Sequence, residues 1–257
     1  MTDAGGSPLT APTGYARFAV DEATVVARDD AKAGIREALQ ICRTLHAWAS
    51  TIPGAKAYEG RATAWGARLP RTGIDVVVRH AQHGGLFASL TGDRFVHPGR
   101  APWELAVSQR LRGAGVPTPE MVAYVLYPAG PGLCRCDVAT RRLPDGADLP
   151  TRWATSDAAS RDALLVATGA LLRALQNIGA HHADLNATNI YVAREGSAWR
   201  AYALDVDRVR FLAPGDARVG GLNFARLRRS LRKLRDHRGL AMPEEAIAHL
   251  AGYAGLA

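Results

Sequence analysis

One stretch, Ala180–Arg208, constrains this chain more than any other, because polar residues stand at fixed distances around a short predicted hairpin. It reads AHHADLNATNIYVAREGSAWRAYALDVDR. Asp184 lies in a His-x-Asp triplet, and Asn189 follows five residues later. The hairpin is predicted from strand-like runs at 190–192 and 199–204 with a turn over 194–197. The second run leads directly into Asp205.

This order of residues is typical of a phosphoryl-transfer site. One carboxylate has to orient the acceptor hydroxyl, while an amide oxygen and a second carboxylate hold Mg²⁺ against the nucleotide phosphates. The hairpin matters because it brings Asp205 back beside Asp184. Each part alone has a simpler interpretation, since HADLN could form an Asx turn and Asp205 could cap the next element. The complete series favours the site.

Composition and charge narrow the class of protein. The 257 residues are 47% hydrophobic and 22% charged, which is ordinary for a folded soluble protein. The net charge is +8, and the segment 221–238 carries seven basic residues against one acid. A concentrated basic face predicts an anionic partner, although a solvated helix face remains the simpler alternative.

Cysteines and termini indicate the compartment. Cys134-x-Cys136 lacks the spacing and the second ligand pair of a zinc site, and with Cys42 it makes no disulfide framework. The first 14 residues contain no basic and apolar pattern of a signal peptide, and we expect them to be disordered. No apolar run is long enough to span a membrane. We therefore expect a reduced, cytoplasmic protein.

The sequence pattern of the N-terminal half predicts strands and a helix, followed by a hairpin that would cover a nucleotide. We expect a strand at 15–20 and one helix from Asp29 to Ser50. Small residues then surround Gly60, Arg61 and Ala62 in a predicted hairpin at 56–69. Glycine lets backbone N–H groups approach phosphates closely, although most stretches of this kind are simple turns.

A cation and a carboxylate follow this hairpin. Arg79 ends the predicted strand 74–79, where a phosphate-binding cation would stand. Glu104 lies in the first turn of a predicted helix at 102–112 and could pair with Arg79. The alternatives are a solvated arginine at a strand end and a glutamate that complements the helix dipole.

The C-terminal half is expected to be mainly helical. Strands at 121–127 and 133–142 precede a boundary at Leu143–Gly146, and a core helix at 160–178 ends at Gly179. We expect a flexible patch at 214–221 and a basic helix from Leu222 to Arg238. Its apolar side is predicted to hold Leu222, Leu227, Leu231 and Leu234. A last short helix begins near Pro243.

These elements predict an α+β fold of the bilobal protein-kinase-like type. A small antiparallel β lobe with one αC-like helix would cover 15–143, after the disordered residues 1–14. A larger, mainly helical lobe would cover 144–257 with the catalytic loop and the basic helix.

Three blocks of sequence resemble the Kdo kinase and heptose kinase family of lipopolysaccharide core biosynthesis. The first is HADLNATNIYV with LDVDR, and the second is Val77–His80 followed by His83-Gly84-Gly85. The third is the NLxRLxRSLxK-like helix at 222–233. The resemblance covers roughly residues 55–240. It implies an ATP-dependent kinase that uses Mg²⁺ to phosphorylate the 4-hydroxyl of a Kdo sugar on a lipid A precursor.

The resemblance also implies roles for individual residues. Asp184 would be the catalytic base, and Asn189 and Asp205 the metal ligands. Arg79 would hold the phosphates with Glu104 as its partner, and Gly60, Arg61 and Ala62 would cover the nucleotide. Four further residues are candidates for binding the acceptor or another anion: Asp207, Arg226, Arg229 and Lys233.

The resemblance further implies its partners, which would be ATP, an anionic glycolipid acceptor and an anionic membrane surface, with no nucleic acid. The enzyme would be peripheral on the cytoplasmic face of the inner membrane. Ala183 replaces the arginine that reads a phosphorylated activation loop, so no such switch is expected. Another small-molecule or protein kinase of this fold, or a nucleotide-binding pseudokinase, remains an alternative.

Overall fold

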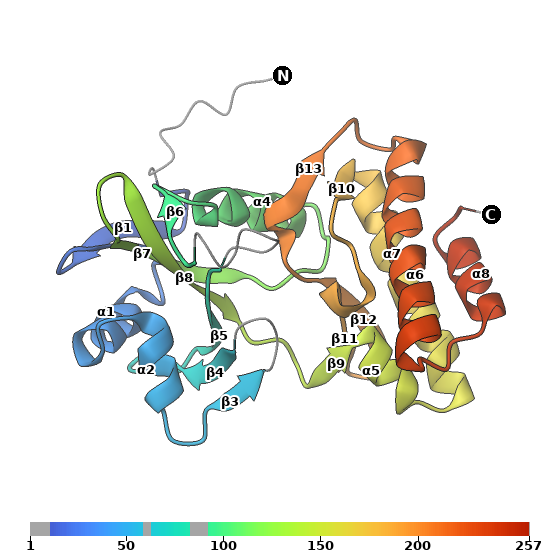
Figure 1. The fold of residues 1–257 in the computed structure, drawn as a ribbon, viewed down its shortest axis with the longest axis horizontal. Coiled ribbons are helices and arrows are strands. Elements are labelled where there is room, and N and C mark those ends of the chain that lie inside the picture. Colours follow the sequence, from blue (N-terminus) through green and yellow to red (C-terminus); the bar gives the residue numbers. More distant parts are fainter. Residues whose placement is uncertain (1–10, 59–62, 83–91, 257) are drawn as a thin grey trace. The chain divides into compact units, whose positions relative to one another are not determined.

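The computed structural model describes residues 11–58, 63–82 and 92–256, and these divide into two units. The first unit covers the chain up to Ala106 together with Glu120–Arg142, and the second covers Val107–Pro119 together with Leu143–Ala257. Both units mix helices with antiparallel sheets (Figure 1). Within the described residues, no helix combines the length and the apolar character needed to cross a membrane.

The first unit is built on one antiparallel sheet, whose described strands run in the order β1-β2-β7-β8-β5-β4-β3, with β6 paired to β8. The strands are β1 (Tyr15–Val20), β2 (Ala23–Arg28), β3 (Lys56–Tyr58), β4 (Ala64–Arg68), β5 (Asp75–His80), β6 (Phe95–Val96), β7 (Met121–Pro128) and β8 (Leu133–Arg141). Its helices are α1 (Lys32–Ile41), α2 (Leu45–Thr51) and the first part of α4 (Ala101–Gly113).

The central strands of this sheet have buried side chains on both faces, since successive side chains of a strand point to opposite sides. Val25 and Val78 pack with Ile35 of α1 and Trp48 of α2 in one cluster. Val26, Tyr124 and Val138 pack with Leu105 of α4 in another. The strand alternation therefore places α1 and α2 on one face and the start of α4 on the other.

The predicted single helix from Asp29 to Ser50 is wrong, because the chain forms two helices there. Cys42 is extended, and Thr44 caps the second helix by accepting a hydrogen bond from the Ala47 N–H at 3.1 Å. A threonine cap of this kind starts a new helix rather than continuing the old one. Ile41, at the end of α1, is 62% exposed.

The second unit places two small sheets beside a group of helices. The sheets are β12-β11-β9 and β10-β13, formed by β9 (Gly146–Asp148), β10 (Ala180–His182), β11 (Ile190–Glu195), β12 (Ala198–Ala203) and β13 (Val209–Phe211). The helices are α5 (Leu149–Ala154), α6 (Ala158–Asn177), α7 (Ala217–Arg238), α8 (Glu244–Tyr253) and two 3-10 turns, η1 (Ala187–Asn189) and η2 (Val206–Arg208). The core gathers Leu164, Leu171 and Leu175 of α6 with Leu227 and Leu231 of α7.

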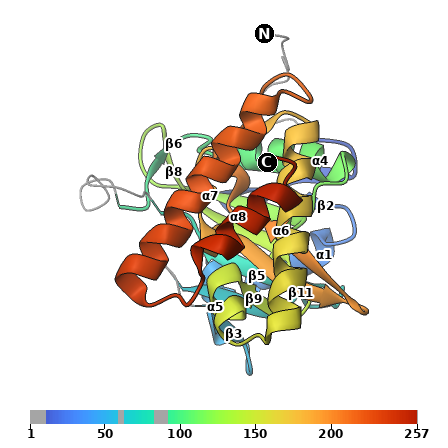
Figure 2. The same cartoon turned by 90° about the vertical axis from the view of Figure 1, so that its right-hand side faces the viewer.

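Helix α6 packs against both α7 and α8 (Figure 2). Gly179 follows the end of α6, where the sequence predicted that this helix stops. Its φ is 69°, and a Cβ there would lie 2.4 Å from the Leu212 carbonyl oxygen. The predicted flexible patch at 214–221 is wrong in its last part, since α7 begins at Ala217. A Cβ at Gly220 would lie 2.1 Å from Gln176 Oε1 of α6, so the end of this side chain would have to shift. Glycine thus permits close packing rather than flexibility.

The segment 107–119 groups with the second unit, whereas the sequence placed all of 15–143 in one lobe. Thr118 Oγ1 donates to the Ala203 carbonyl at 2.8 Å, and the Ala203 N–H donates to the Pro117 carbonyl at 3.0 Å. Leu111 is fully buried in the core of this unit. These contacts tie the end of α4 and the following loop to strand β12.

Part of the predicted disordered N-terminus is also ordered. The Tyr15 N–H donates to the Pro12 carbonyl at 3.0 Å, so residues 11–14 form a turn that leads into β1. Residues 1–10 lie outside the described residues.

Candidate functional site

The predicted hairpin is present in the second unit and brings the polar residues of the motif together. Strand β11 pairs with β12 in antiparallel register, with Ile190 opposite Ala203. One step beyond this pair, the Leu204 N–H donates to the Asn189 carbonyl at 2.8 Å. Leu204 thus lies opposite Asn189, and Asp205 is the next residue of the chain.

Asn189 in turn is bound to the loop that carries Asp184. The Asn189 side-chain Nδ2 donates to the Asp184 backbone carbonyl at 2.9 Å. Because the amide nitrogen is used in this way, the amide oxygen is the atom that remains to accept or to bind a cation. The Asn186 side chain accepts from the Asn189 N–H at 3.0 Å and caps η1. Asp184 and Asn189 are therefore joined by one local network, and Asp205 follows Leu204, the residue bonded to Asn189.

Asp205 has an unusual backbone conformation, with φ 51° and ψ 53°. A residue other than glycine in this left-handed region costs on the order of 1 kcal/mol, although aspartate tolerates it better than most. The turn exposes the Asp205 side chain at the end of β12 while Val206 is buried. Strained backbone conformations of this kind are common at functional sites, where they fix the orientation of a side chain.

His182 stabilises this turn from inside the protein. It is fully buried, and its Nε2 donates to the Leu204 carbonyl at 2.9 Å. Burial lowers the pKa of His182, so the ring is neutral at physiological pH. The histidine of the His-x-Asp triplet is thus a structural link between β10 and the residue before Asp205.

Helix α7 supports the same loop with three polar side chains that the sequence reasoning did not assign to this task. Asn223, fully buried, accepts from the His182 N–H at 2.9 Å and donates to the Ala180 carbonyl at 2.9 Å. Ser230 Oγ accepts from the Ala187 N–H at 3.0 Å. Asn223, Arg226 and Ser230 are spaced by three and four residues, which places them on one side of a helix. In the sequence, the signal that could have identified these residues is their position near the buried leucines of α7.

Arg226 occupies the middle of this row, and its terminal nitrogen donates to Asp184 Oδ1 at 2.6 Å. The two side chains are 31% and 30% exposed. The sequence predicted Arg226 as a residue that binds the acceptor, whereas here it contacts the side chain predicted to be the base. The other anion-binding candidates on α7, Arg229 and Lys233, are exposed.

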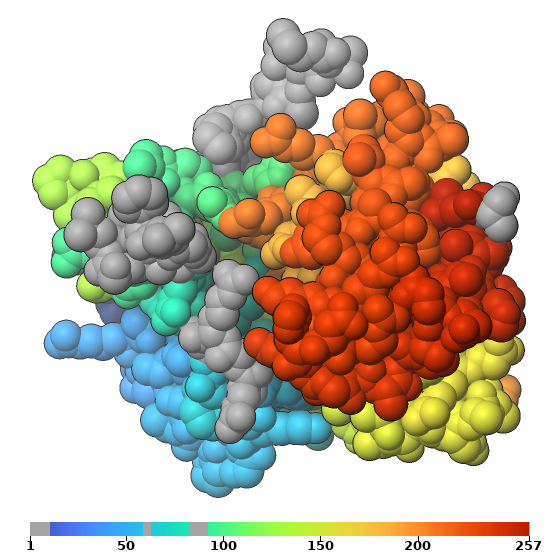
Figure 3. All heavy atoms as spheres, turned by 45° about the vertical axis from the view of Figure 1, so that its right-hand side comes forward, coloured from blue at the N-terminus to red at the C-terminus, as the bar shows by residue number. Residues whose placement is uncertain are grey.

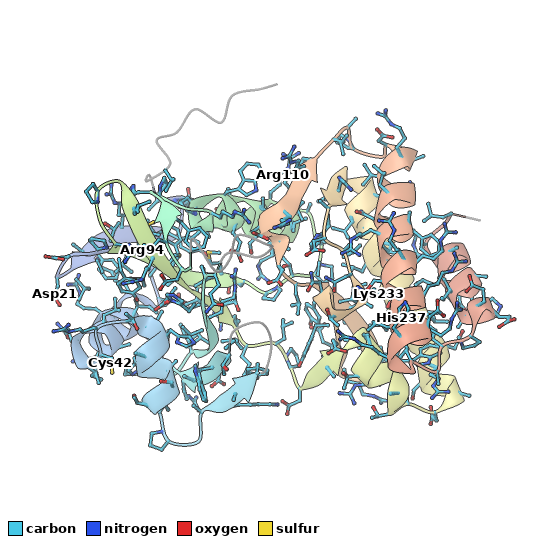
Figure 4. The ribbon with its side chains drawn as sticks, viewed as in Figure 1. Asp21, Cys42, Arg94, Arg110, Lys233 and His237 are labelled. Atoms are coloured by element: carbon cyan, nitrogen blue, oxygen red, sulfur yellow. The ribbon has the colours of Figure 1, made fainter. Side chains whose placement is uncertain are left out.

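The basic surface of α7 is partly neutralised. Arg232 and Arg235 both form ion pairs with Glu244 of α8, which lower the pKa of that carboxyl to about 2. In the space-filling view, α7 and α8 form one continuous surface of the second unit (Figure 3). Lys233 and His237 lie on α7 (Figure 4). Leu222, predicted on the apolar side, is 49% exposed, while Leu227 and Leu231 are buried.

In the first unit, the predicted pair of Arg79 and Glu104 is present as an ion pair between β5 and α4. Glu104 is 7% exposed, so it does more than complement the helix dipole at the surface. Burial of the carboxylate beside a guanidinium holds Arg79 in one orientation. Gly60, Arg61 and Ala62, predicted to cover the nucleotide, lie outside the described residues, as does the Gly84-Gly85 loop.

Next to Arg79, His80 points to the opposite face of the sheet and joins a buried network. His80 Nδ1 lies 2.6 Å from Asp137 Oδ1, and its Nε2 lies 3.1 Å from Asp93 Oδ2. Asp137 Oδ2 also accepts from the His46 N–H at 2.8 Å and from the Tyr127 hydroxyl at 3.0 Å. The contact with Asp137 raises the pKa of His80. The network ties β5, β7 and β8 to the start of α2.

The residues present fit a nucleotide-bound Mg²⁺ better than a metal held by protein alone. Across the described residues, no group of three or more His, Cys, Asp or Glu side chains could hold a metal ion. Asn189 and Asp205 instead offer one amide oxygen and one carboxylate. Mg²⁺ is commonly bound through one or two carboxylates plus substrate phosphates and water. Asp207 lies two residues further, partly buried in η2.

The three cysteines fit the simple interpretation of ordinary thiols. Cys134 and Cys136 are buried on β8, and burial raises the pKa of both. Cys42 is partly exposed. No reactive or metal-binding thiol is indicated among them.

Comparison with known proteins gives the same class as the motif. The model of the lipopolysaccharide kinase (Kdo/WaaP) family matches residues 46–250. The chain is similar to proteins named 3-deoxy-D-manno-octulosonic acid kinase from three organisms. The one from Haemophilus influenzae is 29% identical over 63% of this chain and 67% of the relative. The one from Actinobacillus succinogenes is 29% identical over 72% and 78%. The one from Vibrio parahaemolyticus is 27% identical over 72% and 76%.

A solved structure titled "WaaP in complex with acyl carrier protein" is 20% identical, with a TM-score of 0.44 over 82% of this chain and 89% of that one. This likeness is too weak to support a conclusion. The family match covers most of the chain and includes both the Arg79–Glu104 pair and the Asp184 loop. The chain therefore belongs to the lipopolysaccharide kinase (Kdo/WaaP) family, and it is a kinase.

Proposed function

We propose that this kinase transfers the γ-phosphoryl group of ATP, with Mg²⁺, to the 4-hydroxyl of a Kdo sugar on a lipid A precursor. Two observations support the choice. The curated relatives are named Kdo kinases, and hydrogen bonds link Asn189 to the Asp184 backbone and to Leu204, the residue before Asp205, an order that phosphoryl transfer would use. The local network around Asn189 is the single observation that carries the proposal.

Each residue has a distinct task in the proposed reaction. Asp184 orients the acceptor hydroxyl and takes its proton as the oxygen bonds to the γ-phosphorus. The bond from that phosphorus to the β,γ-bridging oxygen breaks, and ADP leaves. Asn189 and Asp205 would hold Mg²⁺, which neutralises charge on the phosphates. Arg79, oriented by Glu104, binds the phosphates.

The fold proposed for this activity is a bilobal protein-kinase-like fold. The first unit, with its sheet and the Arg79–Glu104 pair, would be the nucleotide-binding lobe. The second unit, with the Asp184 loop, would be the acceptor lobe, and Gly60, Arg61 and Ala62 would cover the nucleotide. Within the second unit, Ala183 offers no guanidinium for a phosphorylated activation loop, so the enzyme needs no such switch.

The acceptor is proposed to be an anionic glycolipid at the cytoplasmic face of the inner membrane, where the enzyme is peripheral. Arg229 and Lys233 on the exposed side of α7 support this, because their charges are available to anionic groups. Asp207 would assist at the acceptor side of the loop. The ion pairs with Glu244 restrict the cationic surface to fewer residues than the sequence suggested.

The test is phosphate transfer from ATP·Mg²⁺ to a Kdo-bearing lipid A precursor by the full chain. We expect Asp184→Ala and Asp205→Ala to fold normally and to keep less than about a tenth of the wild-type turnover, since charge stabilisation and positioning of this kind contribute orders of magnitude. Asp145→Ala, an exposed carboxylate away from the loop, serves as control. More than a tenth of wild-type activity in Asp184→Ala would refute the assignment of the base. Transfer to a different sugar only would refute the acceptor.

A further inference from the structure

The contact between Arg226 and Asp184 has no counterpart in the roles assigned above. Arg226 lies on α7, 42 residues after Asp184, and its terminal nitrogen is 2.6 Å from the Asp184 carboxylate. This is the length of a strong charge-assisted hydrogen bond. A direct contact of this kind restricts the rotation of the carboxylate that has to face the acceptor hydroxyl.

The surroundings of Arg226 are rigid, which is what a positioning contact needs. One turn before it, Asn223 is fully buried and bonded to the backbone on both sides of His181. One turn after it, Ser230 is bonded to the Ala187 N–H. Leu227 is fully buried beside it. The backbone that carries Arg226 is thus fastened to the same loop that carries Asp184.

The alternative is a resting contact that the acceptor has to break. The geometry argues against it, because the Asp184 loop is attached to α7 at three separate places and not by the ion pair alone. Both side chains are only partly exposed, so the pair is less screened than a surface pair. Arg226 binds the Asp184 carboxylate through Oδ1, which leaves Oδ2 for the acceptor.

We propose that Arg226 is a positioning residue of this kinase, which acts through Asp184 by holding one oxygen of its carboxylate so that the other faces the acceptor hydroxyl. This rests on the proposed role of Asp184 in phosphoryl transfer, and it assigns to α7 a part in catalysis besides any contact with an anionic surface. Lysine is a poorer replacement, because it offers a shorter reach and a point charge where arginine offers a planar fork.

The test is a kinetic double-mutant cycle on the full chain with Arg226→Met, Asp184→Asn and the double variant. Arg226→Met should lower kcat roughly 10- to 100-fold, since misplacement of a reacting group by about 1 Å costs that much. The KM for ATP should change less than about twofold, because a group that acts on the acceptor side leaves nucleotide binding intact. Arg226→Lys should recover part of kcat. Arg238→Met, an exposed arginine at the end of the same helix, is the matched control and should keep wild-type kinetics.

The double variant decides how Arg226 acts. If Arg226 works only through Asp184, adding Arg226→Met to Asp184→Asn should cause no further loss of kcat. Losses that multiply would overturn the proposal, because they would mean that Arg226 contacts the substrate directly. An unchanged or increased kcat in Arg226→Met would also overturn it, by showing that the contact is neutral or inhibitory.

The outcome is separable from that of the proposed acceptor. Should the wild type fail to phosphorylate a Kdo-bearing lipid, the acceptor assignment falls, and the same cycle is then measured on ATP hydrolysis, in which Asp184 orients water. A variant that fails to fold is recognised by its far-UV circular dichroism and melting temperature. In that case Arg226→Lys, which keeps the charge, replaces Arg226→Met in the cycle.

Discussion

Asp137 is a fully buried residue whose removal should destabilise the first unit strongly. Its carboxylate is completely buried and accepts three hydrogen bonds, from the His80 ring, the His46 N–H and the Tyr127 hydroxyl. The Tyr127 hydroxyl accepts from the Leu45 N–H at 2.8 Å, so the network reaches the first residue of α2. Asp137→Ala would leave three partly buried donors without this acceptor.

The magnitude follows from this count. Hydrogen bonds to a charged group contribute about 1.5–3 kcal/mol each, so three bonds amount to roughly 4.5–9 kcal/mol. Burial of the carboxylate itself costs several kcal/mol, which offsets part of this sum. We therefore expect Asp137→Ala to lower the free energy of unfolding by about 4 kcal/mol, near the 3–5 kcal/mol typical for breaking one side of a buried pair. That is a large share of the roughly 5–15 kcal/mol that holds a domain together.

The assay is urea unfolding of the full chain, followed by circular dichroism and by amide exchange of β5, β7 and β8. Amide exchange separates the first unit from the second, which matters because two units need not unfold together. Asp162→Ala is the matched control, since Asp162 accepts one hydrogen bond from Tyr253 at the surface and should cost under about 1 kcal/mol. A loss of less than about 1.5 kcal/mol for Asp137→Ala would refute this account of the network.

Two further predictions concern the first unit. The contacts with Asp137 and Asp93 raise the pKa of His80. His80 therefore adds stability that is fully present below the unfolded pKa of about 6.5 and is lost as pH rises through the higher folded pKa. The melting temperature of the wild type should fall as pH rises above about 6.5, and His80→Asn should lose this fall; equal slopes of melting temperature against pH would contradict the prediction. Arg79→Ala should weaken ATP binding roughly 10- to 100-fold, the equivalent of one charge-assisted contact, measured by calorimetry, whereas unchanged affinity would remove Arg79 from the nucleotide site.

The motif of the second unit was readable from the sequence because its geometry is local. A strand, a turn and a second strand bring Asn189 and Leu204 opposite each other through ordinary antiparallel pairing. Apolar periodicity likewise predicted α6, and Gly179 marked the position where the chain turns. The Arg79–Glu104 pair was predicted by analogy with the strand lysine and helix glutamate of kinases, and the ion pair is present.

Local signals also misled where two elements of one type follow each other. The apolar stripe from Ile35 to Trp48 continues across Cys42, so periodicity alone joined α1 to α2. The threonine at position 44 was the only sign of a new cap. Gly220 was interpreted as flexible because glycine disfavours helices, while the close approach of Gln176 is visible only once α6 and α7 are packed.

The amino-acid pattern therefore specified the order of the motif and most helices and strands, because these depend on neighbours within a few residues. The family followed from the resemblance of three sequence blocks to known proteins. Tertiary structure alone decided that Arg226 contacts Asp184, that Asn223 and Ser230 hold the same loop, and that Asp137 joins His80. These partners are separated by about 40 residues or more in the chain. The contacts of α7 depend on how this helix rotates and packs against the loop, whereas Asp137 meets His80 because β8 pairs with β5. A linear pattern contains neither the rotation of the helix nor the pairing of the strands.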